Sequence, residues 1–344
     1  DKGQRELEGV IRKEIGKLIR LLFTASEADQ TLLRKITLVG NTVMHHLFCG
    51  IDLEPLSHYP FEPKDDGLQI FKACELGWEL PGNPTVLFLP CLGSFVGSDI
   101  LAGVLATRLH ESTELVGLVD LGTNGEIVIG NRQGMLCAST AAGPAFEGAR
   151  ISMGMRAATG AIWRVSALDG RMECEVLGNV PPRGICGSGL VDAVAVGLDL
   201  GLVLPNGRLA HRDAILPLLE PVVLTQADIR QLQLAKGAIA AGIRLLLQQY
   251  GAAPEDMARL YLAGAFGNYI NRTSARRIGL LNFPPEKVHP VGNTALLGAK
   301  LALFSSTNEE VSYAGIRRKV RHIALNADPL FIDTYVEEMG FPEE

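Results

Sequence analysis

A strand-end aspartate beside a glycine turn is the part of this sequence best suited to chemistry. Residues 120–126 are Asp-Leu-Gly-Thr-Asn-Gly-Glu, and apolar runs precede and follow them. Backbone N–H groups of such a turn, with the Thr123 hydroxyl, can surround phosphate oxygens, while Asp120 can hold Mg²⁺ through water. An ordinary hairpin with Asn-Gly at its tip has the same pattern. The predicted phosphate contacts are Gly122, Thr123, Asn124 and Gly125, and Asp120 is the predicted metal ligand.

Three more segments of small residues stand where helices are expected to begin. They are Gly187-Ser188-Gly189, Gly264-Ala265-Phe266-Gly267 and the stretch from Gly93 to Asp99. Small residues let a ligand approach the helix N-terminus, which favours anions. Each segment could instead be a close helix–strand contact, but the combination favours a nucleotide site. The residues predicted to contact the nucleotide here are Gly187, Ser188, Gly264, Ala265 and Gly267.

Carboxylates near these segments are candidates for the chemical step. Asp99 lies in the first turn of an expected helix, where it could orient Mg²⁺ or an attacking water, or simply complement the helix dipole. Glu126 and Glu147 could act as a general base, belong to the Mg²⁺ shell or have a structural role. Asp99, Asp120 and Glu126 are the predicted catalytic residues.

The elements that must position these residues alternate between strand and helix. Short apolar runs at 36–39, 86–89, 115–120, 126–129, 259–262 and up to Val291 predict strands, with helical periodicity between them. The turn at 120–125 is expected to be a hairpin with glycines at positive φ. Residues 225–250 predict the longest helix, with Thr225 as N-cap and Asp228 completing a capping box. This alternation indicates an α/β fold.

One local pattern occurs twice. Gly40-Asn41-Thr42 and Gly292-Asn293-Thr294 each follow an apolar run and precede an apolar helix. Coincidence explains this as well as two related halves do, since Gly-Asn-Thr suits many strand-to-helix turns. If the halves are related, the first lacks the counterpart of the hairpin at 120–125. It is therefore expected to be truncated at its start.

Composition and charge narrow the classes of protein. The chain has 344 residues, a net charge of −6 and no basic run, so nucleic acid is not an expected partner. No apolar stretch is long enough to span a membrane. The six cysteines form no C-x-x-C motif and fit no zinc or iron–sulfur spacing, which predicts buried free thiols in a reducing cytoplasm. Glycine is enriched, with 38 residues against a usual share of about 7%.

In order along the chain, these segments resemble a known family. The arrangement resembles the second half of the actin/Hsp70/sugar-kinase (ribonuclease-H-like) ATPase fold. More closely, eight strings from about residue 36 to 342 resemble the reductive activators of corrinoid enzymes: VGNTVMHHLFCGID, LPCLGSFVGSDILAG, LVDLGTNGEIVIG, AAGPAFEGARISMGMRAATGAI, GICGSGLVDAVA, QLQLAKGAIAAGI, LYLAGAFGNYIN and VGNTALLGAKLAL.

The resemblance implies a function. These activators use ATP to drive the reduction of inactive cob(II)alamin to the cob(I)alamin that methyl transfer requires. The implied cofactors are ATP and Mg²⁺, and the implied partner is a corrinoid protein. Residues 120 and 122–125 match the second phosphate motif, and 264, 265 and 267 match the adenosine motif. Lys236 lies on the helix that borders adenine in related ATPases, although a solvated helix charge is an equal expectation. A homodimer is compatible with the resemblance.

Two departures from the family lead us to expect a fragment of a longer protein. The chain has no cluster-binding cysteine pattern, so the iron–sulfur domain is expected in a missing part, and the first phosphate hairpin is also absent. ATP hydrolysis by this chain alone is therefore expected to be weak or absent. Residues 1–114 are expected to form an incomplete first lobe, 115–304 the second ATPase lobe, and 305–344 a C-terminal extension packing on the lobes. A small-metabolite kinase of the same fold, or a nucleotide-gated protein-binding module, is the alternative.

Overall fold

The computed structural model describes residues 2–304 and 309–343, without the side chains of residues 265 and 309–312. The described chain divides into two compact units. The first unit comprises Asp1–Glu111, Arg132–Cys137 and Asn293–His322, and the second comprises Ser112–Asn131, Ala138–Gly292 and Ile323–Glu344. These limits differ from the expected lobes, because residues 293–304 belong to the first unit. The first four residues of the expected extension, 305–308, lie outside the described residues.

The first unit contains a three-stranded sheet in the order β1-β3-β2, so β1 is an edge strand. Strand β3 is parallel to β1 and antiparallel to β2. The core beside this sheet includes Phe48, Trp78 and Phe88, and two isoleucines of the long N-terminal helix pack against it. The elements of this unit are α1 (Lys2–Ser26), β1 (Lys35–Leu38), α2 (Thr42–Cys49), β2 (Gln69–Lys72), β3 (Thr85–Phe88), α3 (Ser98–Thr107), α8 (Thr294–Phe304), α9 (Glu309–Arg317) and β14 (Val320–His322), the last pairing with the start of β6 (Gly134–Thr140).

Both Gly-Asn-Thr segments begin helices, as expected. The Asn41 side chain accepts a hydrogen bond from the backbone N–H of Met44, and Asn293 accepts one from Leu296. Gly97 permits a close approach to this segment, since a Cβ added at Gly97 would lie 2.2 Å from the Gly40 carbonyl oxygen. The same carbonyl accepts the N–H of Ser98, the first residue of α3. The start of α3 is thus bound to protein carbonyl rather than open to an anion.

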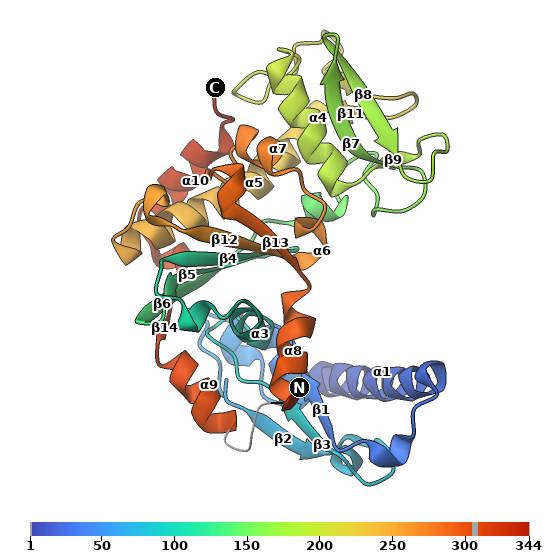
Figure 1. Ribbon diagram of the computed structural model, residues 1–344, viewed down its shortest axis with the longest axis vertical. Helices are drawn as coiled ribbons and strands as arrows, with labels where there is room; N and C mark the ends of the chain where they lie inside the picture. Colours follow the sequence, from blue (N-terminus) through green and yellow to red (C-terminus); the bar gives the residue numbers. More distant parts are fainter. Residues whose placement is uncertain (1, 305–308, 344) are drawn as a thin grey trace. The chain divides into compact units, whose positions relative to one another are not determined.

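The second unit contains strands in the order β13-β12-β4-β5. Strand β12 is parallel to both β13 and β4, and β4 is antiparallel to β5. Helix α5 lies along this sheet (Figure 1). A Cβ added at Gly125 would lie 2.8 Å from Cγ1 of Ile239 in α5. The strands are β4 (Val116–Leu121), β5 (Gly125–Asn131), β12 (Arg259–Ala263) and β13 (Val288–Gly292), and the helices are α5 (Gln226–Tyr250), α6 (Gly264–Gly267), α7 (Arg272–Arg277) and α10 (Phe331–Met339).

A smaller subdomain of the second unit follows β6 in the chain. Strand β7 pairs with β8 on one side and with β9 on the other, and α4 packs on β7. These elements are β7 (Ala161–Leu168), β8 (Arg171–Val176), β9 (Gly184–Ile185) and α4 (Gly187–Asp199). A separate hairpin of β10 (Ile215–Pro217) and β11 (Val223–Thr225) follows α4 in the chain.

Several expectations can be compared directly with these elements. The α/β class and the capping box of Thr225 and Asp228 at the start of α5 are confirmed. The expectation of positive φ in the hairpin at 120–125 is wrong for Gly122 and Gly125. Gly125 instead needs room for Ile239. The thiols are free, but only Cys91, Cys137 and Cys186 are buried, while Cys74 is exposed.

Candidate nucleotide site

A cavity of about 950 Å³ in the second unit brings several predicted residues together. Its volume falls in the range typical of small-molecule sites. Five predicted site residues, drawn from three separate segments of the sequence, line the cavity: Asp120, Gly122, Gly187, Ser188 and Gly264. The segments meet here because α4 and α6 both begin at its wall.

The turn between β4 and β5 forms part of the cavity wall, where Leu121 and Gly122 line it. Asp120 and Glu126 are paired across the two strands, and the Gly122 N–H donates to the Asn124 carbonyl over 3.0 Å. Thr123 donates a hydrogen bond to Glu147, with 2.5 Å between Oγ1 and Oε1. Glu126 accepts one from Ser139 at 3.3 Å. The Thr123 hydroxyl and the three carboxylates of this turn region are oxygen donors of the kind that Mg²⁺ binds.

Gly264 lies directly beside Asp120. A Cβ at Gly264 would be 2.8 Å from Asp120 Oδ1, and the backbone there has φ +90°. Only glycine allows the start of α6 to approach the aspartate this closely without strain. Gly267, at the end of this helix, is buried against Leu262 of β12. Ala265 belongs to it too, and its side chain lies outside the described part of the structure.

The start of α4 forms another wall. A Cβ at Gly187 would lie 2.0 Å from the Phe146 carbonyl oxygen and 3.0 Å from Phe266 Cε2. The two phenylalanine rings stack with their centroids 4.9 Å apart. Ser188 is buried, and its hydroxyl donates to the Trp163 carbonyl over 2.8 Å.

Two of the predicted residues that do not line the cavity have other surroundings. Asp99 belongs to the first unit, where its carboxylate accepts the N–H of Ile100 at 2.9 Å and burial raises its pKa. Lys236 is 1% exposed, donates to the Gly340 carbonyl and lies 5.5 Å from the centroid of the Phe341 ring. Burial lowers the Lys236 pKa to about 8. Neither residue is among those that line the cavity.

Sequence patterns missed an apolar wall of the same cavity. Its side chains come from strands, helices and loops far apart in the sequence, so no local spacing signals the wall as a whole, although Phe266 belongs to a segment singled out for its small residues. They are Phe146, Met155, Trp163, Leu177, Phe266 and Tyr269.

A divalent metal fits this site only if phosphate groups and waters supply the contacts that the protein does not. Among the described residues, no group of three or more His, Cys, Asp or Glu side chains could hold a metal ion. Mg²⁺ is ordinarily bound through one or two carboxylates together with substrate phosphates and waters. Asp120 and Glu147 meet that requirement.

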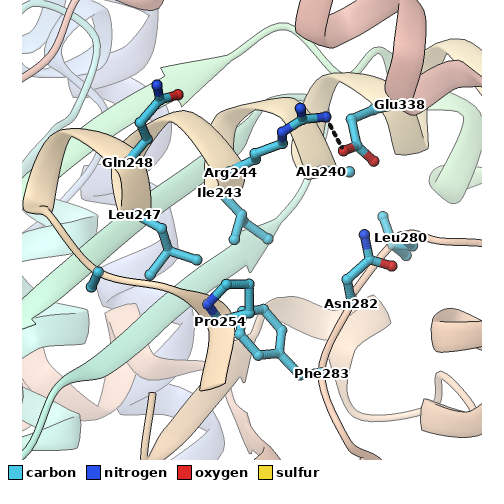
Figure 2. A pocket seen from close by; sticks show the side chains of 11 residues that line it. Ala240, Ile243, Arg244, Leu247, Gln248, Pro254, Leu280, Asn282, Phe283 and Glu338 are labelled. Atoms are coloured by element: carbon cyan, nitrogen blue, oxygen red, sulfur yellow. Dashed lines mark hydrogen bonds and ion pairs between the residues drawn. The ribbon is translucent and has the colours of Figure 1, made fainter. Parts of the chain in front are cut away.

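A second cavity, of about 410 Å³, lies in the same unit beside α5 (Figure 2). Ile243, Leu247 and Phe283 give it an apolar floor, and Arg244 forms an ion pair with Glu338 at 3.2 Å. The described residues that line it include none of the predicted site residues. Separately, no described helix has the length and apolar character needed to cross a membrane.

Comparison with known proteins supports the assignment of the fold. Residues 114–344 match the family model described as the C-terminal domain of RACo, the ASKHA domain, and residues 1–112 match the RACo middle region. ASKHA denotes the actin/Hsp70/sugar-kinase-like fold.

Similar proteins have names that refer to corrinoid activation. The chain is 36% identical over 360 residues to the corrinoid activation enzyme RamQ of Eubacterium limosum, covering 96% of this chain and 60% of that protein. It is 29% identical over 373 residues to a [Co(II) methylated amine-specific corrinoid protein] reductase of Methanosarcina barkeri, covering 97% and 67%.

A solved structure agrees with these matches. It is a reductive activator for corrinoid, iron–sulfur protein, with TM-score 0.85 and 34% identity over 99% of this chain and 57% of that one. The chain spans about 60% of the length of the first of these curated relatives. The chain thus belongs to the RACo family and contains its middle region and its ASKHA domain.

Proposed function

We propose that this chain is the nucleotide-binding ATPase region of a reductive activator that returns corrinoid proteins from Co(II) to Co(I). The observation that carries the proposal is the cavity where Asp120, Gly187 and Gly264 meet, in a chain of the RACo family. The names of its relatives refer to corrinoid activation, which supports a corrinoid protein as partner.

The proposed roles follow from position. Asp120 and the Thr123–Glu147 pair hold Mg²⁺ and the terminal phosphates, with the backbone of Gly122, Asn124 and Gly125 as further phosphate contacts. Gly187, Ser188, Gly264, Ala265 and Gly267 form the rest of the nucleotide wall. Asp99 and Lys236 remain proposed contributors from the resemblance, and Glu126 remains one from its place beside the turn, although none of the three lines the cavity.

Nucleotide is proposed to act by favouring one conformation of the chain over another. A ligand shifts such an equilibrium only by its difference in affinity for the two states. The electron for Co(II) is proposed to come from an iron–sulfur domain of a longer parent protein, as the resemblance to the reductive activators implies. This chain's own residues would bind and orient the nucleotide.

The direct test uses the longer protein with a candidate corrinoid protein in its Co(II) state, a reductant and Mg-ATP. We expect Co(I) absorbance to appear only with ATP, and D120N to slow its appearance at least tenfold. Equal Co(I) formation without ATP would contradict the proposal.

The 344-residue chain is proposed to hydrolyse ATP weakly or not at all by itself. Phosphate release measured with and without the longer protein's remaining segments tests this. Turnover by the isolated chain equal to that of the longer protein would overturn it.

A further inference from the structure

The nucleotide cavity has two chemically different kinds of lining. Asp120, Gly122 and Glu147 line it near the glycine turn, and most of the large side chains elsewhere in its wall are apolar or aromatic, with Arg156 as a charged exception. A ligand that fits both kinds of lining has a charged part and a planar or apolar part. The residues near the turn explain how the charged part of the ligand is bound, but not how the planar or apolar part is bound.

Contacts order the cavity from one end to the other. Asp120 lies beside Gly264, which begins the helix carrying Phe266. The Phe266 ring lies against Gly187, and the next residue, Ser188, donates to the Trp163 carbonyl. Trp163 therefore lies at the opposite end of this series of contacts from the phosphate turn.

Trp163 has a local reason to face the cavity. The register between β7 and β8 shifts between Ile162 and Arg164, which leaves Trp163 opposite no partner residue. A bulge of this kind redirects a side chain and often occurs next to a binding site. Its indole is partly buried and lines the cavity with Leu177, which follows β8.

We propose that Trp163 is the platform on which the nucleobase stacks, with Met155, Leu177 and Tyr269 enclosing the ring. This inference rests on the proposed function and adds how the base is recognised. These side chains offer ring faces and apolar groups on which a base can stack, and Arg156 and the Tyr269 hydroxyl are the polar groups of the same wall. Stacking on an aromatic side chain tolerates different bases, because every base has a π-face.

Intrinsic fluorescence provides the first test, since the chain has only two tryptophans. Trp78 is 2% exposed and belongs to the core of the first unit, so W78F leaves Trp163 as the single reporter. Mg-ATP is expected to change the emission of W78F and to protect it from acrylamide quenching. Unchanged emission and unchanged quenching at saturating Mg-ATP would overturn the proposal.

Calorimetric titration with two ligands provides the second test. W163A is expected to bind Mg-ATP about tenfold or more weakly, the scale of one lost stacking contact, and Mg-tripolyphosphate unchanged. W163F, which keeps a ring, should recover most of the affinity. L168A removes an exposed apolar side chain from the same strand and should bind both ligands as the wild type does.

The outcomes separate the two proposals. Equal binding of Mg-ATP by W163A and wild type, or equal weakening of both ligands, would overturn the role of Trp163 alone. If the wild-type chain binds neither ligand, the nucleotide site itself is contradicted, and the proposed function with it.

Discussion

Thr123 and Glu147 are joined by a hydrogen bond of 2.5 Å between Oγ1 and Oε1. Thr123 lies in the turn after β4, and Glu147 ends the short 3₁₀ helix Pro144–Glu147. The bond ties the glycine turn to the loop that follows β6. It also keeps a carboxylate beside the place where phosphates are proposed to bind.

Removing the charge of Glu147 should therefore change the metal dependence of binding. We expect E147Q to bind Mg-ATP about tenfold more weakly, a loss typical of one charge-assisted contact, and to bind metal-free ATP no worse than the wild type. Titration of ATP with and without Mg²⁺ measures both. E173Q, on an exposed position of β8, is the matched control. The same Mg²⁺ dependence in E147Q and wild type would contradict the role given to Glu147.

Gly264 should tolerate no side chain. Alanine there combines a strained positive φ with a Cβ 2.8 Å from Asp120 Oδ1 and 2.9 Å from the Leu121 carbonyl oxygen. We expect G264A to lower the free energy of unfolding by about 2–4 kcal/mol, the sum of strain and overpacking. Urea denaturation followed by circular dichroism measures this.

Gly170 provides the control for that substitution. Its φ is +72°, close to that of Gly264, but no heavy atom lies within 4 Å of an added Cβ. G170A should cost only about 1 kcal/mol, from backbone strain alone. Equal losses in the two variants would show that the approach to Asp120 has no energetic weight.

Asp228 holds a loop of the nucleotide cavity to helix α5. Its carboxylate accepts hydrogen bonds from the N–H and hydroxyl of Ser152, at 2.7 and 2.6 Å, and from the same two groups of Thr225, both at 2.8 Å. Three residues after Ser152, the same loop places Met155 at the cavity wall. The bonds therefore link the cap of α5 to the position of that wall.

Asparagine at this position would replace one of the two accepting carboxylate oxygens by an NH₂ group, which donates hydrogen bonds and cannot accept them. We expect D228N to lower the free energy of unfolding by about 2–4 kcal/mol and to weaken Mg-ATP binding. S152A removes a single one of the four bonds and should cost about 1–2 kcal/mol. Thermal and urea unfolding, with titration of Mg-ATP, separate the two effects. Loss of stability without any loss of nucleotide affinity would show that Asp228 does not position the loop.

The sequence predicted those features that depend on neighbours in the chain. The hairpin at 120–125 and the α5 cap at Thr225 follow from local turn and capping chemistry, and the structure has both. The apolar wall could not be predicted, since Trp163 faces the cavity through a register shift that depends on β8. The limit between units near residue 293 also depends on packing, because α8 packs on α3, far away in sequence.

Lys236 should make stability depend on pH above neutrality. Burial lowers its pKa from the usual 10.5 to about 8, although nearby Glu338 opposes the shift. Between these two values the unfolded chain keeps a proton that the folded protein has lost. The unfolded state then binds more protons, so the free energy of unfolding contributed by this group rises with pH, by at most about 1.4 kcal/mol per unit.

K236M removes the titrating group while keeping an apolar stem. We expect the difference in unfolding free energy, wild type minus K236M, to be constant below about pH 8, to rise up to about pH 10.5 and then to level off. Below pH 8 the Lys236 ammonium is charged in both the folded and the unfolded protein. The difference in unfolding free energy in that range therefore combines the cost of burying the charge with the contacts of Lys236 to the Gly340 carbonyl and the Phe341 ring. Comparing the two proteins cancels the titration of the tyrosines and cysteines they share. Urea denaturation from pH 7 to 11 gives the curve, and a flat difference would mean that Lys236 keeps its ordinary pKa in the folded protein.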